Sequence, residues 1–136
     1  MAIYTPLSGD CALLDKMLRL ALSTNENYIL KLYQNNYTPD DNAAAGSFTE
    51  ANFTSYAAIT LTRAGWYASA IVSTHAETSY ATQSWTCGAS GNTIYGYYVT
   101  GATSGTVLWA ELFATSRVLA SSDVLNLTPK FTLQHA

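Results

Sequence analysis

Apolar and polar positions alternate through the last third of the chain, from Gly91 to Leu133. A period of two residues places successive side chains on opposite faces of a strand. The segment predicts three strands joined by turns, each with one face packed inward and the other turned to solvent or to a partner. The alternating sets are Val107, Trp109, Glu111 and Phe113 against Leu108, Ala110 and Leu112, and Leu125, Leu127, Phe131 and Leu133 against polar residues.

The chain ahead of this segment predicts one helix and then further strands. Leu14, Met17, Leu18 and Ala21 recur at helical spacing and predict an amphipathic helix over residues 10–22. A loop is expected over residues 35–47, where Asn, Pro and Asp gather. The other expected strands cover residues 28–34, 57–62, 67–73 and 78–86.

This order of elements predicts a mostly β protein. We expect an antiparallel β-sandwich, jelly-roll-like, of about seven or eight strands with one N-terminal α-helix, and a barrel is the alternative. The 136 residues predict a single domain. Within it, residues 1–27 form an N-terminal arm and helix, and residues 28–136 form the β-sandwich.

Charge is scarce in this sequence. Charged residues make up 11% of the chain, against about 25% in typical domains, and the net charge is −3. Thr, Ser, Asn and Tyr are therefore expected to cover the exterior. Six basic residues without a patch exclude nucleic-acid binding. No apolar run is long enough to span a membrane, and no cleaved secretory signal is expected.

The reactive side chains do not assemble into a known catalytic or metal-binding pattern. His75 and Glu77 are expected to be solvated loop residues rather than an acid–base pair. Asp40-Asp41-Asn42 lacks the remaining ligands of a calcium loop, so neither a metal nor a cofactor is expected. Cys11 and Cys87 are expected to be small buried side chains rather than a disulfide.

Glu111 and the aromatic residues are the most informative individual positions. Glu111 stands in an apolar run, so it either pairs with Arg117 or Arg63, within or between subunits, or lies at an exposed rim. Alternation places Tyr95 and Tyr97 on the face opposite Ile94 and Tyr98, where a partner could reach them. Trp85 and Tyr98 are expected in the core.

Three stretches of the sequence resemble a known class of proteins. They are LKLYQNNYTPDDNAAAGSFTEANFTSY, then W-x-C-G-x-x-G-N-T-I-Y-G-Y-Y-V, and then VLWAELFATSRVLASSDVLNLTPKFTL, which closes with Ser122–Pro129. Together they cover roughly residues 28–133 and resemble small structural proteins encoded by tailed bacteriophages. The resemblance implies a virion protein with a β-sandwich fold, no enzymatic activity and a homo-oligomeric state.

Within that class, the expected role is that of a capsid decoration or cement protein, made in the host cytoplasm. It would bind the outer surface of the major capsid protein shell and bridge capsomers, as a trimer rather than a dimer. The alternatives are a tail, baseplate or receptor-binding component, or a carbohydrate-binding module that stacks Trp66 or Trp109 on sugar. The expected partner contacts are Ala2, Ile3, Tyr4, Thr5, Pro6, Tyr37, Pro39, Asp40, Asp41, Tyr95, Tyr97, Trp109 and Glu111.

Overall fold

The computed structural model describes residues 8, 11, 14–19 and 26–134. The described part is mostly β, its strand pairs are antiparallel, and its sheets do not close into a barrel. The chain divides into two compact units. Unit 1 comprises Met1–Asn25, Thr62–Thr82 and Thr128–Ala136, and unit 2 comprises Glu26–Leu61 and Gln83–Leu127. The expected single domain with a boundary after residue 27 stays a prediction.

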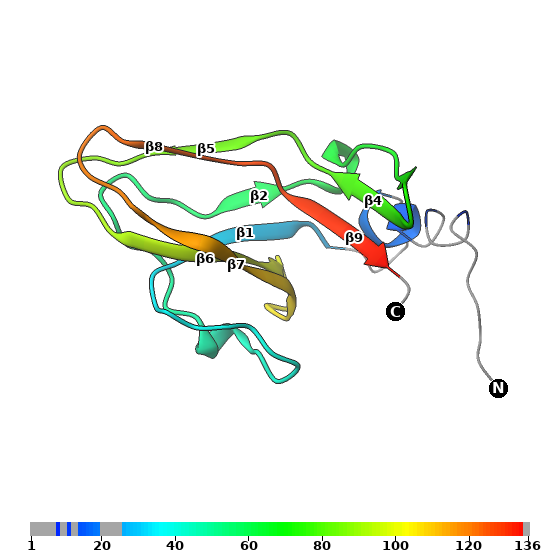
Figure 1. The fold of residues 1–136 in the computed structure, drawn as a ribbon, viewed down its shortest axis with the longest axis horizontal. Coiled ribbons are helices and arrows are strands. Elements are labelled where there is room, and N and C mark those ends of the chain that lie inside the picture. Colours follow the sequence, from blue (N-terminus) through cyan, green and yellow to red (C-terminus); the bar gives the residue numbers. More distant parts are fainter. Residues whose placement is uncertain (1–7, 9–10, 12–13, 20–25, 135–136) are drawn as a thin grey trace. The chain divides into compact units, whose positions relative to one another are not determined.

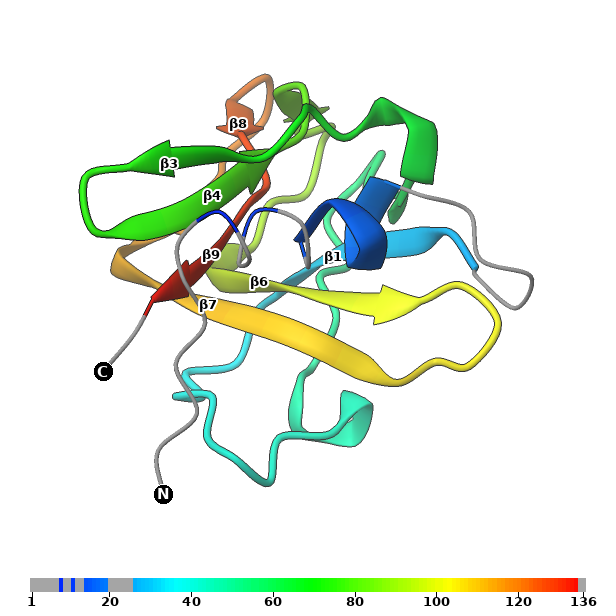
Figure 2. The same cartoon turned by 90° about the vertical axis from the view of Figure 1, so that its right-hand side faces the viewer.

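Unit 2 contains a four-stranded sheet with the order β2-β1-β6-β7. Its strands are β1 (Tyr28–Tyr33), β2 (Ile59–Leu61), β6 (Thr93–Gly101) and β7 (Val107–Val118). A second pair, β5 (Gln83–Thr86) with β8 (Val124–Leu127), lies over one face of this sheet (Figure 1). The loop that follows β1 lies on the opposite face (Figures 1 and 2).

The face toward β5 and β8 is apolar because β1 alternates as its sequence predicts. Tyr28, Leu30 and Leu32 are buried, whereas Ile29 and Lys31 are half-buried. Leu30 lies opposite Val99 of β6, and Leu32 lies opposite Tyr97. Burying one such leucine side chain stabilises the fold by roughly 1.5–3 kcal/mol. Trp85 of β5 is also buried, and its Nε1 donates a hydrogen bond to the Ala57 carbonyl at 2.8 Å.

The β6–β7 hairpin is irregular at two points. Its register shifts between Ile94 and Gly96 and again between Val99 and Thr100. At Gly96 the backbone of β7 comes so close that a Cβ atom would collide with the Glu111 carbonyl oxygen and the Tyr33 ring. Glycine is therefore required at this position, since it is the only residue without a Cβ atom.

Unit 1 contains a three-stranded sheet of β3 (Ala70–Val72), β4 (His75–Ser79) and β9 (Lys130–Gln134), in the order β3-β4-β9 (Figure 2). Trp66 is buried and packs edge-on against Tyr80, with 5.4 Å between ring centroids. The short helices are η1 (Asp15–Arg19) and η3 (Arg63–Gly65), and unit 2 adds η2 (Ala45–Ser47). The Asp15 carboxylate accepts a hydrogen bond from the Ser69 amide at 3.0 Å, which ties η1 to the chain ahead of β3.

Two expected strands are divided in the structure. Residues 78–86 contribute to β4 and β5, and the closing run contributes to β8 and β9, so nine strands are described. Pro129 explains the second division because proline has no N–H to donate to a ladder. Its carbonyl instead accepts a hydrogen bond from the Tyr80 amide at 2.9 Å. Tyr80 lies between β4 and β5, where the other expected strand is divided.

The predicted N-terminal helix is not shown at its expected length. Within residues 10–22, the described element is the five-residue π-helix η1, and residues 10, 12, 13 and 20–22 lie outside the described residues. Leu14 and Leu18 are buried as the helical stripe predicts. Met17 was wrongly assigned to that stripe, since its side chain is 52% exposed.

Candidate functional site

An open hollow in unit 2 brings several of the predicted contact residues together. It has a volume of about 400 Å³ and lies between the loop of residues 39–43 and the start of β7. Its lining residues are Pro39, Asp40, Asp41, Ala43, Val107, Leu108, Trp109 and Ala110. Four of these, Pro39, Asp40, Asp41 and Trp109, were predicted from the sequence. The hollow therefore combines two acidic side chains with an apolar wall.

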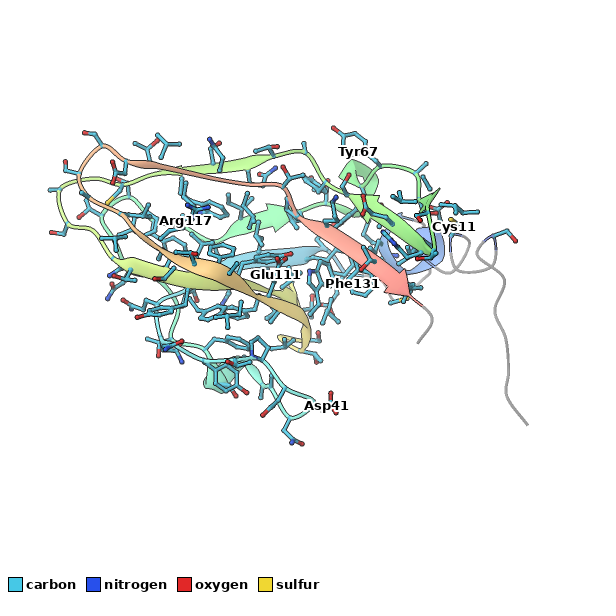
Figure 3. All side chains as sticks on the ribbon, viewed as in Figure 1. Cys11, Asp41, Tyr67, Glu111, Arg117 and Phe131 are labelled. Atoms are coloured by element: carbon cyan, nitrogen blue, oxygen red, sulfur yellow. The ribbon has the colours of Figure 1, made fainter. Side chains whose placement is uncertain are left out.

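Hydrogen bonds within the loop fix its shape. The Asp40 carboxylate accepts from the Asn42 amide at 2.9 Å and from the Tyr37 hydroxyl at 3.2 Å. At the base, the Asn35 side chain donates to the Ser47 carbonyl at 3.0 Å and accepts from the Thr49 amide at 2.7 Å. Asn and Asp side chains favour such turns because they bond to nearby backbone groups. Asp41 is left exposed at the outer end of the loop (Figure 3).

Aromatic stacking attaches the loop to the sheet. Phe48, at the end of the loop, stacks on Tyr98 of β6 with 4.5 Å between ring centroids and 10° between the planes. The Phe48 ring also meets Tyr33 at 5.1 Å and Tyr37 edge-on at 5.3 Å. Desolvation raises the pKa of Tyr33 and Tyr98 to about 12, with smaller contributions from Glu111 and Glu50 respectively. The loop is thus part of the packed structure.

Tyr97, Trp109 and Glu111 form a second group on β6 and β7, and Trp109 belongs also to the lining of the hollow. Tyr97 lies directly across from Glu111, and the neighbouring Val99 lies across from Trp109. Burial raises the pKa of Tyr97, and a hydrogen bond to the Glu111 carboxylate raises it further, while a hydrogen bond with Trp109 acts in the opposite direction. The carboxylate that the sequence leaves unexplained in an apolar run is thus partnered by a tyrosine hydroxyl.

The predicted contact residues outside the loop of residues 39–43 differ in what the structure shows of them. Ala2, Ile3, Tyr4, Thr5 and Pro6 lie outside the described residues. Tyr97 is only 2% exposed, so its side chain is part of the core of unit 2. Glu111 is exposed, and Trp109 and Tyr37 are half-buried.

The predicted orientation of Tyr95 is wrong. Its side chain packs against the cluster of Tyr33, Phe48 and Tyr98, although alternation placed it on the face opposite Tyr98. The register shift between Ile94 and Gly96 interrupts strict alternation at this point. The predictions that Trp85 and Tyr98 belong to the core are confirmed, since both are buried.

Sequence reasoning did not find the Lys31–Glu50–Tyr56 cluster. Lys31 Nζ lies 3.0 Å from the Glu50 carboxylate, which also accepts a hydrogen bond from the Tyr56 hydroxyl at 3.1 Å. The Tyr56 oxygen in turn accepts from the Leu32 amide at 3.1 Å. Burial raises the pKa of Tyr56. Glu50 and Tyr56 follow Lys31 by 19 and 25 positions, and the pairing of Tyr33 with Glu50 brings these segments together.

His75 and Glu77 are not loop residues as predicted, but lie on β4. Glu77 is 3.5 Å from the His75 ring and 3.1 Å from Lys130 Nζ of the paired strand β9. The hydrogen bond from Lys130 is the main cause that lowers the pKa of Glu77. A carboxylate held in its ionised form by a lysine suits an ion pair on a sheet surface better than proton transfer.

The described residues contain neither a candidate metal cluster nor a candidate membrane-spanning helix, and their two cysteines are free. They contain no group of three or more His, Cys, Asp or Glu side chains placed to hold a metal ion. No helix among them has the length and hydropathy of a membrane span. Cys11 and Cys87 are both free thiols; Cys87 is buried as expected, and Cys11 is half-buried.

Comparison of the chain with protein-family models, with curated proteins and with solved structures finds no match.

Proposed function

We propose that this chain is a non-enzymatic structural protein of a tailed-phage virion, and that it decorates the capsid. It binds the outer surface of the major capsid protein shell and stabilises it. The fold that we propose for this role is a jelly-roll-like β-sandwich, in which β5 and β8 form part of the layer that faces the four-stranded sheet. The resemblance of residues 28–133 to small phage structural proteins supports this setting.

The hollow between residues 39–43 and β7 is the observation that carries the proposal. A contact site for a rigid protein shell needs a preformed surface, because loop ordering on binding reduces affinity. The loop meets this condition through its internal hydrogen bonds and through the stacking of Phe48 on Tyr98. Many weak contacts of this kind add up when each particle presents many copies of the site.

The residues that line the hollow indicate what kind of capsid-protein segment it would bind. Leu108 is 45% exposed and forms the apolar wall with Val107 and Pro39. Asp40 and Asp41 contribute negative charge at the other side. An extended capsid segment with an apolar side chain followed by a lysine or arginine would match both parts.

A carbohydrate-binding role is less well supported. Trp66, one of the two tryptophans considered for stacking on sugar, is only 2% exposed. The other, Trp109, is half-buried and interacts with Tyr97. A sugar ring needs an open aromatic face.

Co-sedimentation with capsids tests the proposal. Purified protein is mixed with empty capsids of the encoding phage that lack it, and the pelleted fraction is measured. Leu108→Ser is expected to reduce binding at least tenfold. Ile71→Ser is the matched control, because Ile71 is similarly exposed, at 52%, but lies on β3 and is not among the residues that line the hollow. Equal binding by both variants would rule out the hollow, and binding to isolated tails instead of capsids would rule out decoration.

A further inference from the structure

We propose that two copies of this chain associate through their β7 strands, antiparallel about a two-fold axis at Ala114. Glu111 of each copy then faces Arg117 of the other. This inference concerns self-association and does not rest on the proposed function.

The free edge of β7 is the first observation behind this inference. Among the described strands, β7 pairs with β6 alone and forms one edge of the sheet β2-β1-β6-β7. It is twelve residues long, whereas β2 at the opposite edge has three residues. Edge strands present unpaired N–H and C=O groups, and proteins commonly protect them by shortening the strand or by adding proline or lysine. β7 is long and contains neither residue, and its irregularities are the two register shifts against β6.

The charges on β7 are self-complementary. Glu111 and Arg117 are its only charged residues, both are exposed, and neither forms an ion pair with any described residue. Both side chains are labelled on β7 in Figure 3. They lie six positions apart, so an antiparallel copy centred on Ala114 places each Glu111 opposite an Arg117. Opposite charges across strands stabilise a pair, and like charges destabilise it.

This charge pattern also selects the register. An axis at Leu112 would place Arg117 opposite Val107, and an axis at Ser116 would place it opposite Thr115. Only the axis at Ala114 matches both charges. The larger register shift of β7 against β6 falls between Leu112 and Arg117. Pairing about Ala114 places residues 110–112 of one copy beside residues 116–118 of the other, within the bounds of β7.

The exposure of the apolar residue Val118 is consistent with the register centred on Ala114. Val118 is the most exposed large apolar residue among those described, at 74%. In the proposed pair it lies opposite Ala110 of the second copy. The two four-stranded sheets then form one continuous sheet of eight strands. Such an assembly closes after two copies, so it predicts a dimer in place of the trimer expected from the sequence.

Charge reversal tests the pairing. The measurement is the mass of the purified chain by analytical ultracentrifugation at ~100 µM, a concentration suited to a small interface. The wild type is expected at twice the monomer mass of 14.7 kDa. Glu111→Arg and Arg117→Glu should each weaken the dimer on the order of tenfold, because each places like charges opposite each other twice. An equimolar mixture of the two variants should restore dimers, since every cross-strand pair is then of opposite charge.

Cysteine cross-linking tests the axis independently. Ala114→Cys should form an intermolecular disulfide under mild oxidation, because only residues at the axis face their own copies at Cα distances near 5.5 Å. Ala102→Cys, in the exposed turn after β6, is the matched control and should not cross-link. Three results would overturn the proposal. The wild type could be a monomer or trimer at the concentration used for ultracentrifugation, the charge-reversal variants could dimerise as the wild type does, or the mixture of the two variants could stay monomeric.

Discussion

Replacement of Phe48 by alanine is expected to be among the most destabilising single changes in unit 2. The ring is 6% exposed and meets three other aromatic rings, at 4.5 Å (Tyr98), 5.1 Å (Tyr33) and 5.3 Å (Tyr37). Phe→Ala changes in cores cost about 3–5 kcal/mol, which covers lost transfer free energy and the cavity that remains. We expect a decrease of about 3–4 kcal/mol in the free energy of unfolding, since the loop can partly collapse onto the vacated space.

Urea unfolding followed by tryptophan fluorescence measures this decrease. Phe48→Leu keeps most of the buried area but loses the stacking, so it should cost only about 1–2 kcal/mol. Tyr67→Ala is the control: Tyr67 is 58% exposed, and its loss should change stability by less than about 0.5 kcal/mol. A Phe48→Ala decrease below about 1 kcal/mol would show that the loop is not held to the sheet by this cluster.

Three further predictions concern pH and backbone packing. The lowered pKa of Glu77 means that its ion pair with Lys130 stabilises the fold above about pH 4.5 and is lost as pH falls below that value. Urea unfolding should therefore show a smaller loss of stability between pH 5.5 and 3 for Glu77→Gln than for the wild type, by a few tenths of a kcal/mol. The pKa of about 12 for Tyr33 and Tyr98 predicts that their contribution to stability is full below pH 10 and is lost as pH rises toward 12. Absorbance at 295 nm should show these phenols ionising after the exposed ones. Titration of all tyrosines together near pH 10 would contradict their burial. Gly96→Ala should lower the free energy of unfolding by about 1–3 kcal/mol, because the added Cβ would meet the β7 backbone. Gly46→Ala is the control and should change it little, since the space around Gly46 is open. Equal effects of the two variants in urea unfolding would refute the close approach at Gly96.

The sequence predicted the elements of this fold better than their interruptions. Alternation at Tyr28, Leu30 and Leu32 identified β1 and its buried face, because a side chain's face follows directly from the period of two. The same rule misplaced Tyr95, since a register shift depends on how two strands pair and leaves no local signal. Pro129 is the local sequence feature that indicates the division of the last predicted strand into β8 and β9.

The candidate site was predictable only in part. Pro39, Asp40 and Asp41 were found because turn residues in an acidic loop are visible in the sequence. Leu108 was missed as a contact residue, since its exposure follows from its place on an edge strand beside that loop. Glu111 was recognised as unusual, yet its partner Tyr97 was identified only once β6 and β7 were paired in register.

Cryo-electron microscopy of virions tests the central claim most directly. Particles of the encoding phage are compared with particles in which this gene is deleted. Decoration predicts difference density on the outer surface of the capsid shell, in contact with the major capsid protein through the hollow of residues 39–43 and β7. Difference density at the tail or baseplate, or no difference between the two particles, would contradict it.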